Sequence, residues 1–246
     1  MQNLLPMSSN DILYNIIYKD TPSSKVTVEA HIRVPKIVKC VFSGLLSSQK
    51  ESENDNKLTH YHFTQKNPIP TYLIVLAAGD IEYSSNTERT GIWAEKELLA
   101  KATYEFANAD LFIKKAEEYL DSPYVWGKYD ILVLPMSFPY GGMENPTITF
   151  LSPTAVAGDQ SLENIVAHEI AHSWTGNCVT NYDWTNFWLN EGFTVFLERK
   201  IIELVYGEDI FKLLCKVGYD GLLNAISSIG QDHSHTSLTP DINGVI

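Results

Sequence analysis

The residues of this chain that could do chemistry are concentrated in AHEIAHSW, residues 167–174. Residues four apart lie on one face of a helix, so His168 and His172 can direct two imidazole nitrogens at one point, as metal ligands do. Glu169 is turned about 100° around the helix from His168, so it flanks that point and can act as a general base on water. A catalytic zinc ion needs three protein ligands. The third candidate is Glu191, in FWLNEGF, with eighteen residues between it and His172.

An alternative is that the two histidines are surface residues of an amphipathic helix. The neighbouring side chains argue against it, because they are apolar and predict a buried helix. They are Ile165, Val166, Ala167, Ile170, Ala171 and Trp174. Buried polar groups need partners, and one zinc ion would supply a partner to both imidazoles and to the carboxylate of Glu191. The pattern therefore favours a metal centre.

A second candidate stretch is FPYGGMENP, residues 138–146. Gly141 and Gly142 permit another part of the chain to approach closely, and a free strand edge can align an extended peptide by adding it to the sheet. Glu144 could then hold the protonated amine at the start of that peptide. A glycine turn followed by a solvated glutamate explains the same residues equally well.

The first third of the chain, residues 1–85, has the alternation of β structure. Strands are expected over 25–34, 58–64 and 72–75, with Pro68 and Pro70 in the turn before the last of them. Three histidines on these strands are expected to be ordinary surface or core residues. They are His31, His60 and His62.

The remainder, residues 86–246, has helical periodicity interrupted by short strands. Apolar positions recur at three- and four-residue steps over 94–120, which predicts one long helix or two in series. Buried strands are expected over 129–135 and 147–150, and later helices over 161–176, 185–206 and 209–226. Ser161 is the expected N-cap of the first of these later helices. Glu198 lies seven residues beyond Glu191 on the same face, where it could orient a ligand histidine or form a surface salt bridge.

Composition narrows the function classes. With 246 residues, 44% of them hydrophobic, the chain is long and apolar enough for a packed core. Its net charge of −12 argues against nucleic acid and anionic membranes as partners. Its apolar runs are too short to span a bilayer, and the N-terminus has no signal-peptide pattern. Three cysteines without pairing rhythm predict reduced thiols and a cytoplasmic protein.

Taken together, HEIAH, the glutamate of WLNEGF and the preceding GGMEN resemble the M1 zinc aminopeptidases, from about Asp20 to the C-terminus. The resemblance implies an α+β fold: a partial β-rich N-terminal domain, residues 1–85, then a thermolysin-like zinc-peptidase lobe of mixed sheet and helices, residues 86–246. It implies one zinc ion per chain on His168, His172 and Glu191, with Glu169 as general base. Peptides with a free N-terminus would be the substrates, and a lipid epoxide is a further substrate that the resemblance permits. The expected substrate-lining residues are Pro139, Tyr140, Gly141, Gly142, Met143 and Glu144.

The chain also departs from the family pattern. Residues 7–19 are expected to be an insertion or a mis-joined segment, and the chain is expected to be incomplete at both ends. The family places an oxyanion-stabilising tyrosine beyond Ile246, and neither Tyr206 nor Tyr219 has a matching context. Because one oxyanion donor contributes about 10² to 10³ in rate, the alternative function is a zinc-binding but catalytically impaired fragment.

Overall fold

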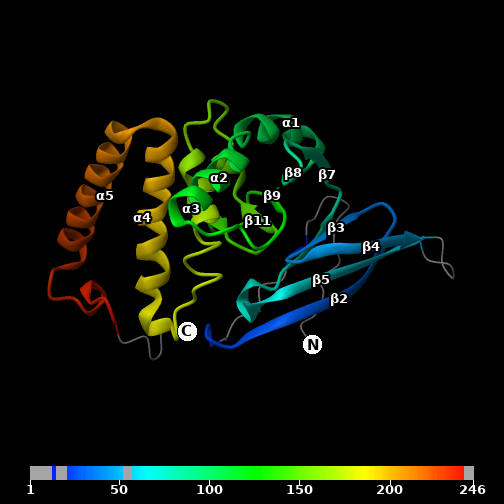
Figure 1. The fold of residues 1–246 in the computed structure, drawn as a ribbon, viewed down its shortest axis with the longest axis horizontal. Helices are drawn as coiled ribbons and strands as arrows, with labels where there is room; N and C mark the ends of the chain where they lie inside the picture. Colours follow the sequence, from blue (N-terminus) through cyan, green and yellow to red (C-terminus); the bar gives the residue numbers. More distant parts are fainter. Residues whose placement is uncertain (1–12, 15–20, 52–56, 241–246) are drawn as a thin grey trace.

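The computed structural model describes residues 13–14, 21–51 and 57–240 of the chain. Two regions follow one another along the sequence, first strands and then helices around a mixed sheet, as the sequence predicted (Figure 1). The segment 7–19, which was expected to be an insertion, lies outside the described residues except for 13–14. None of the helices in the described part has the length and apolar character needed to cross a bilayer.

The N-terminal region contains two three-stranded antiparallel sheets. One has the order β2-β5-β4. Its strands are β2 (Lys25–Pro35), β5 (Leu58–Pro70) and β4 (Leu45–Glu51). The other has the order β1-β6-β3. Its strands are β1 (Leu13–Tyr14), β6 (Leu76–Gly79) and β3 (Lys39–Phe42).

Two details of this region differ from the sequence prediction. The strand predicted over 72–75 is instead a 3-10 turn, η1 (Thr71–Leu73), that leads into β6. Pro68 and Pro70 do not form the turn before a strand, because they lie at the end of β5, where Pro70 is opposite Lys25. The end of a strand tolerates proline, which has no amide hydrogen to donate. Tyr72 and Leu73 are buried there in a 3-10 turn, so burial alone did not identify a strand.

The second region is built on a five-stranded sheet with the order β10-β11-β9-β8-β7. Its strands are β7 (Glu82–Ser85), β8 (Thr90–Ala94), β9 (Tyr129–Val133), β10 (Gly142–Met143) and β11 (Ile148–Leu151). The three central strands are parallel, and β10 and β7 are antiparallel edges. Strand β7 belongs to this sheet although it precedes the expected division after residue 85, and the division itself stays a prediction.

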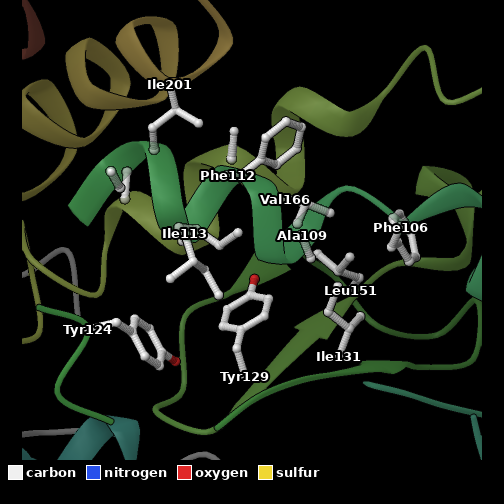
Figure 2. Packing of buried hydrophobic residues seen from close by; sticks show 14 of the residues in the cluster. Phe106, Ala109, Phe112, Ile113, Tyr124, Tyr129, Ile131, Leu151, Val166 and Ile201 are labelled. Carbon is white, nitrogen blue, oxygen red and sulfur yellow. The ribbon is translucent and has the colours of Figure 1, made fainter. Parts of the chain in front are cut away.

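Five helices accompany this sheet in the described part of the chain. They are α1 (Lys96–Glu105), α2 (Ala109–Leu120), α3 (Glu163–Ala171), α4 (Phe187–Tyr206) and α5 (Glu208–Ile229). The first two are the pair in series that the periodicity allowed. Short 3-10 turns lie at η2 (Pro153–Ala155), η3 (Trp184–Asn186) and η4 (Ser234–Thr236). Phe112 and Ile113 of α2 belong to one buried cluster with Val166 of α3, Ile201 of α4 and Leu151 of β11 (Figure 2).

Helix α3 begins and ends differently from the prediction. Its N-cap is Leu162, and no side chain caps it. The backbone N–H of Ser161 donates to the carboxylate of Asp159 at 3.0 Å, which makes Ser161 part of a preceding turn. The regular helix ends at Ala171, several residues before Gly176, because the N–H groups of Ser173 and Trp174 bond three residues back. His172 keeps right-handed helical angles, so it still shares a face with His168.

Candidate metal centre

Helices α3 and α4 pack together and bring the three predicted ligands to one point. The Nε2 atoms of His168 and His172 are 3.1 Å apart. Nε2 of His168 lies 3.4 Å from Oε2 of Glu191, and Nε2 of His172 lies 3.8 Å from Oε1 of the same carboxylate. Donors bound at about 2.0–2.2 Å around a tetrahedral zinc ion are roughly 3.3–3.6 Å apart. The donor types and their separations therefore fit zinc with sub-ångström adjustment.

Each imidazole is held by its second nitrogen. The Nδ1 atom of His168 is 3.0 Å from the carboxylate of Glu198, whose other oxygen accepts a hydrogen bond from Asn164 at 3.2 Å. The Nδ1 atom of His172 is 3.2 Å from the backbone carbonyl of Thr175. With the ring proton on Nδ1 in both residues, Nε2 is left as the metal-directed atom. Glu198 is buried, so it is not the surface salt bridge that the sequence left open.

Thr194, which the sequence did not single out, is fully buried beside the centre. Its hydroxyl lies 3.1 Å from Nδ1 of His172 and 2.7 Å from the carbonyl oxygen of Thr175, which also contacts that imidazole. Thr194 therefore fixes the group that orients His172. The available signal was its position three residues beyond Glu191, which puts both on one face of α4.

Glu169 is buried beside the centre but is not among the three converging donors. Its Oε2 atom has no hydrogen-bond partner in the described residues. Burial raises the pKa of Glu169 well above its ordinary value, and the nearby charge of Glu144 raises it further. Oxygen atoms of Glu144 and Glu169 lie within 4.8 Å of each other and of a nitrogen of His172. A group with this pKa and one free oxygen can both accept and return a proton.

Edge strand β10 lies against Glu169. A Cβ atom on Gly142 would be 2.1 Å from Oε1 of Glu169, whereas one on Gly141 would meet no atom of the described residues within 4 Å. The sequence prediction attributed both glycines to the approach of another backbone. Within the described residues the close contact at Gly142 is with a side chain, and the approach of a substrate backbone stays a prediction.

Glu144 follows β10 directly and is buried, which excludes the solvated glutamate that the sequence left open. Its backbone carbonyl accepts a hydrogen bond from the side-chain amide of Asn177 at 2.8 Å. Asn177, also missed from the sequence, ties the turn after α3 to the end of β10. Such a contact between distant segments has no sequence periodicity to reveal it.

The other predicted lining residues lie outside the group of three converging donors. Pro139, Tyr140 and Gly141 are exposed in the segment before β10, and Met143 is half-buried against the hydrophobic core. The hydroxyl of Tyr206 donates to Glu163 at the beginning of α3. The contacts of Pro139, Tyr140, Gly141 and Met143 with substrate stay predictions.

The electrostatics of the metal-free centre follow from the same contacts. Burial lowers the pKa of His168, but hydrogen bonds to Glu191 and Glu198 outweigh burial and raise it to about 10. Burial raises the pKa of Glu191, but hydrogen bonding to His168 and the charge of His172 lower it more. His168 of the metal-free centre therefore holds an extra proton at neutral pH, and a divalent ion would displace that proton.

Comparisons with known proteins agree with this geometry. Residues 104–236 match the peptidase family M1 domain. The chain is 48% identical over 227 residues to leukotriene A-4 hydrolase of Xenopus laevis, covering 92% of this chain and 37% of that protein. It is 41% identical over 231 residues to leucine aminopeptidase 2 of Aspergillus terreus, covering 92% of this chain and 36% of that protein.

A solved structure of yeast LTA4 hydrolase in complex with bestatin is also similar. It superposes with a TM-score of 0.82 at 42% identity, over 90% of this chain and 34% of that chain. The present chain thus spans about a third of the length of these relatives.

Proposed function

The chain belongs to peptidase family M1, and from that premise we propose that it is a zinc-dependent aminopeptidase, which removes the first residue from peptides with a free N-terminus. One observation carries the proposal: three donors with zinc-like separations meet beside a buried carboxylate, Glu169, that is not one of them. The free thiols of Cys40, Cys178 and Cys215 support the predicted cytoplasmic location.

Zinc would be held by His168, His172 and Glu191. When bound, it would supply a Lewis acid that polarises the scissile carbonyl and makes water more acidic. Glu198 and Thr175 would keep both imidazoles in the tautomer that presents Nε2.

Glu169 would take a proton from the attacking water and pass it to the leaving amine. Its Oε2 atom has no hydrogen-bond partner among the described residues, and its raised pKa lets the same group act as base and then as acid. Gly142 leaves room for the carboxylate at this position.

Glu144 would bind the protonated amine of the substrate. Two buried carboxylates, Glu144 and Glu169, lie close enough to repel each other, and a substrate ammonium group would offset that repulsion. The substrate chain would extend along β10, which is an edge strand with β11 on one side. An ammonium held at the end of this strand limits entry to one residue, which favours an aminopeptidase over an endopeptidase.

A lipid epoxide is a second candidate substrate for the same centre. The observation that favours it is the 48% identity to a protein named leukotriene A-4 hydrolase. Incubation of the purified protein with a lipid epoxide would yield a diol if this proposal holds.

The test combines metal content with turnover. The purified chain should retain one zinc ion after dialysis against zinc-free buffer and should hydrolyse a leucine arylamide. Glu169→Gln should retain that zinc and lose about 10² to 10⁴ in turnover, because only the proton transfer is removed. His172→Ala should lose the zinc.

Loss of zinc in Glu169→Gln would refute the role assigned to Glu169. Retained zinc without turnover in the unmodified chain would support the alternative of a zinc-binding, catalytically impaired fragment.

A further inference from the structure

Two of the histidines expected to be ordinary strand residues are brought together on the sheet β2-β5-β4. His31 of β2 lies directly opposite His62 of β5 in the antiparallel register. Their rings are stacked, with centroids 4.3 Å apart and planes 6° apart. Glu29, two residues before His31, lies on the same face of β2, because side chains alternate along a strand.

Both imidazoles point a nitrogen at one carboxylate oxygen. The Oε1 atom of Glu29 is 3.2 Å from Nε2 of His31 and 2.8 Å from Nε2 of His62. All three donor atoms lie within 4.8 Å of one another. Nitrogen lone pairs lie in the ring planes, and because these planes are nearly parallel, the two stacked rings must rotate apart before both lone pairs can meet one ion.

We propose that Glu29, His31 and His62 form a second metal site, which takes a borderline divalent cation such as Zn²⁺, Ni²⁺ or Cu²⁺. Two imidazoles and one carboxylate are the donor types these ions prefer, and water would complete the coordination. Donors around such an ion are roughly 3.3 Å apart, so the carboxylate oxygen must withdraw slightly and the two rings must tilt out of their stack. The side chains of Glu29 and His31 are 63% and 71% exposed, which leaves them free to adjust.

The site is separate from the centre on α3 and α4, because its ligands come only from β2 and β5. It does not depend on the proposed peptidase activity. The net charge of −12 further favours cation binding over the whole surface.

The test is equilibrium dialysis of the full chain against buffered Zn²⁺, with bound metal counted per chain. His31→Ala/His62→Ala should bind one zinc ion fewer than the unmodified chain. His168→Ala/His172→Ala should keep that ion, so that the two sites are counted independently. An equal zinc content in the unmodified chain and in His31→Ala/His62→Ala would overturn the proposal and leave the cluster as an ion pair only.

Two control variants test whether any histidine pair would give the same result. His60 lies on the same strand two residues from His62, and His60→Ala should retain the ion. His233 and His235 form another close ring pair, with centroids 4.7 Å apart, and their double alanine variant should also retain it. Loss of the same zinc ion in either control would overturn the assignment to His31 and His62.

A second measurement does not depend on how the variants fold. Substoichiometric Cu²⁺, added to the chain with its tighter centre already loaded with Zn²⁺, should broaden the ring-proton NMR signals of His31 and His62 before those of His60. Signals of His31 and His62 that stay sharp while others broaden would overturn the proposal.

Discussion

Gly142 lies directly against the carboxylate of Glu169, so closely that a Cβ atom on Gly142 would be 2.1 Å from Oε1. The contact joins edge strand β10 to helix α3. A strand that could align a substrate and a carboxylate that could act as base are therefore held in one fixed relationship.

This contact predicts different effects for two neighbouring substitutions. Gly142→Ala should lower turnover of an arylamide by about 10² or more, because the methyl group displaces Glu169 and small misplacements of a catalytic group are costly. Gly141→Ala should stay close to the unmodified chain, since its Cβ would meet nothing within 4 Å. Steady-state kinetics and a melting curve on both variants check this. Equal effects of the two substitutions would contradict the assigned contact.

A second prediction concerns the group that orients His168. Glu198→Gln should lower zinc affinity about 10- to 100-fold, because the carboxylate at 3.0 Å from Nδ1 fixes the ring and increases its basicity. Competition with a chelating dye measures the affinity. Glu203→Gln is the matched control, because Glu203 lies on the same helix but pairs with Lys200. A zinc affinity that Glu198→Gln leaves unchanged would show that the imidazole is positioned by other contacts.

Removal of the metal should destabilise the packing of α3 on α4. Ligand binding at 1,000 times its dissociation constant contributes about 4 kcal/mol, so chelation should lower the melting temperature on the order of 10 °C. The pKa of His168 is about 10 in the metal-free centre, so zinc must displace a proton below that pH. Affinity should rise about tenfold per pH unit through the neutral range, measured by calorimetry at several pH values. A zinc affinity that does not change with pH would contradict the claim that zinc displaces a proton from His168.

The fourth prediction concerns Asp130 on β9, outside the centre. Burial raises the pKa of Asp130, although Lys128 and Trp93 act to lower it. Above the ordinary value of 3.8, the unfolded carboxyl group is ionised while the folded one still holds its proton, so the free energy of unfolding falls as pH rises through that window. Asp130→Asn should abolish this decrease in the free energy of unfolding. The difference in melting temperature, variant minus unmodified chain, should therefore increase as pH rises.

Asp159 is the control, because its pKa is shifted in the direction opposite to that of Asp130. It is exposed, and hydrogen bonds from Ser161 lower its pKa, so its small contribution is present above pH 3.8 and is lost as pH falls. Asp159→Asn should therefore show no gain with rising pH. Parallel melting curves for Asp130→Asn and the unmodified chain at every pH would contradict the shifted pKa of Asp130.

Local spacing was sufficient to predict the parts of the molecule that are encoded within a few turns of chain. The four-residue step between His168 and His172 predicted a shared helical face. The apolar periodicity over 94–120 predicted one long helix or two in series, and the structure has two, α1 and α2. Errors fell where local signals compete. Tyr72 and Leu73 are buried like strand residues but form a 3-10 turn. Ser161 is a good capping residue, but its hydroxyl and its N–H both bond to Asp159.

The sequence by itself determined which side chains were candidates for the chemistry, because helical and strand periods are properties of neighbouring residues. Only the tertiary structure decided which groups surround them. Thr194 beside His172, Asn177 on the carbonyl of Glu144, and His31 opposite His62 are contacts between segments remote in the chain. Such contacts follow from how the helices and sheets pack, and the packing depends on the shape of every buried side chain at once.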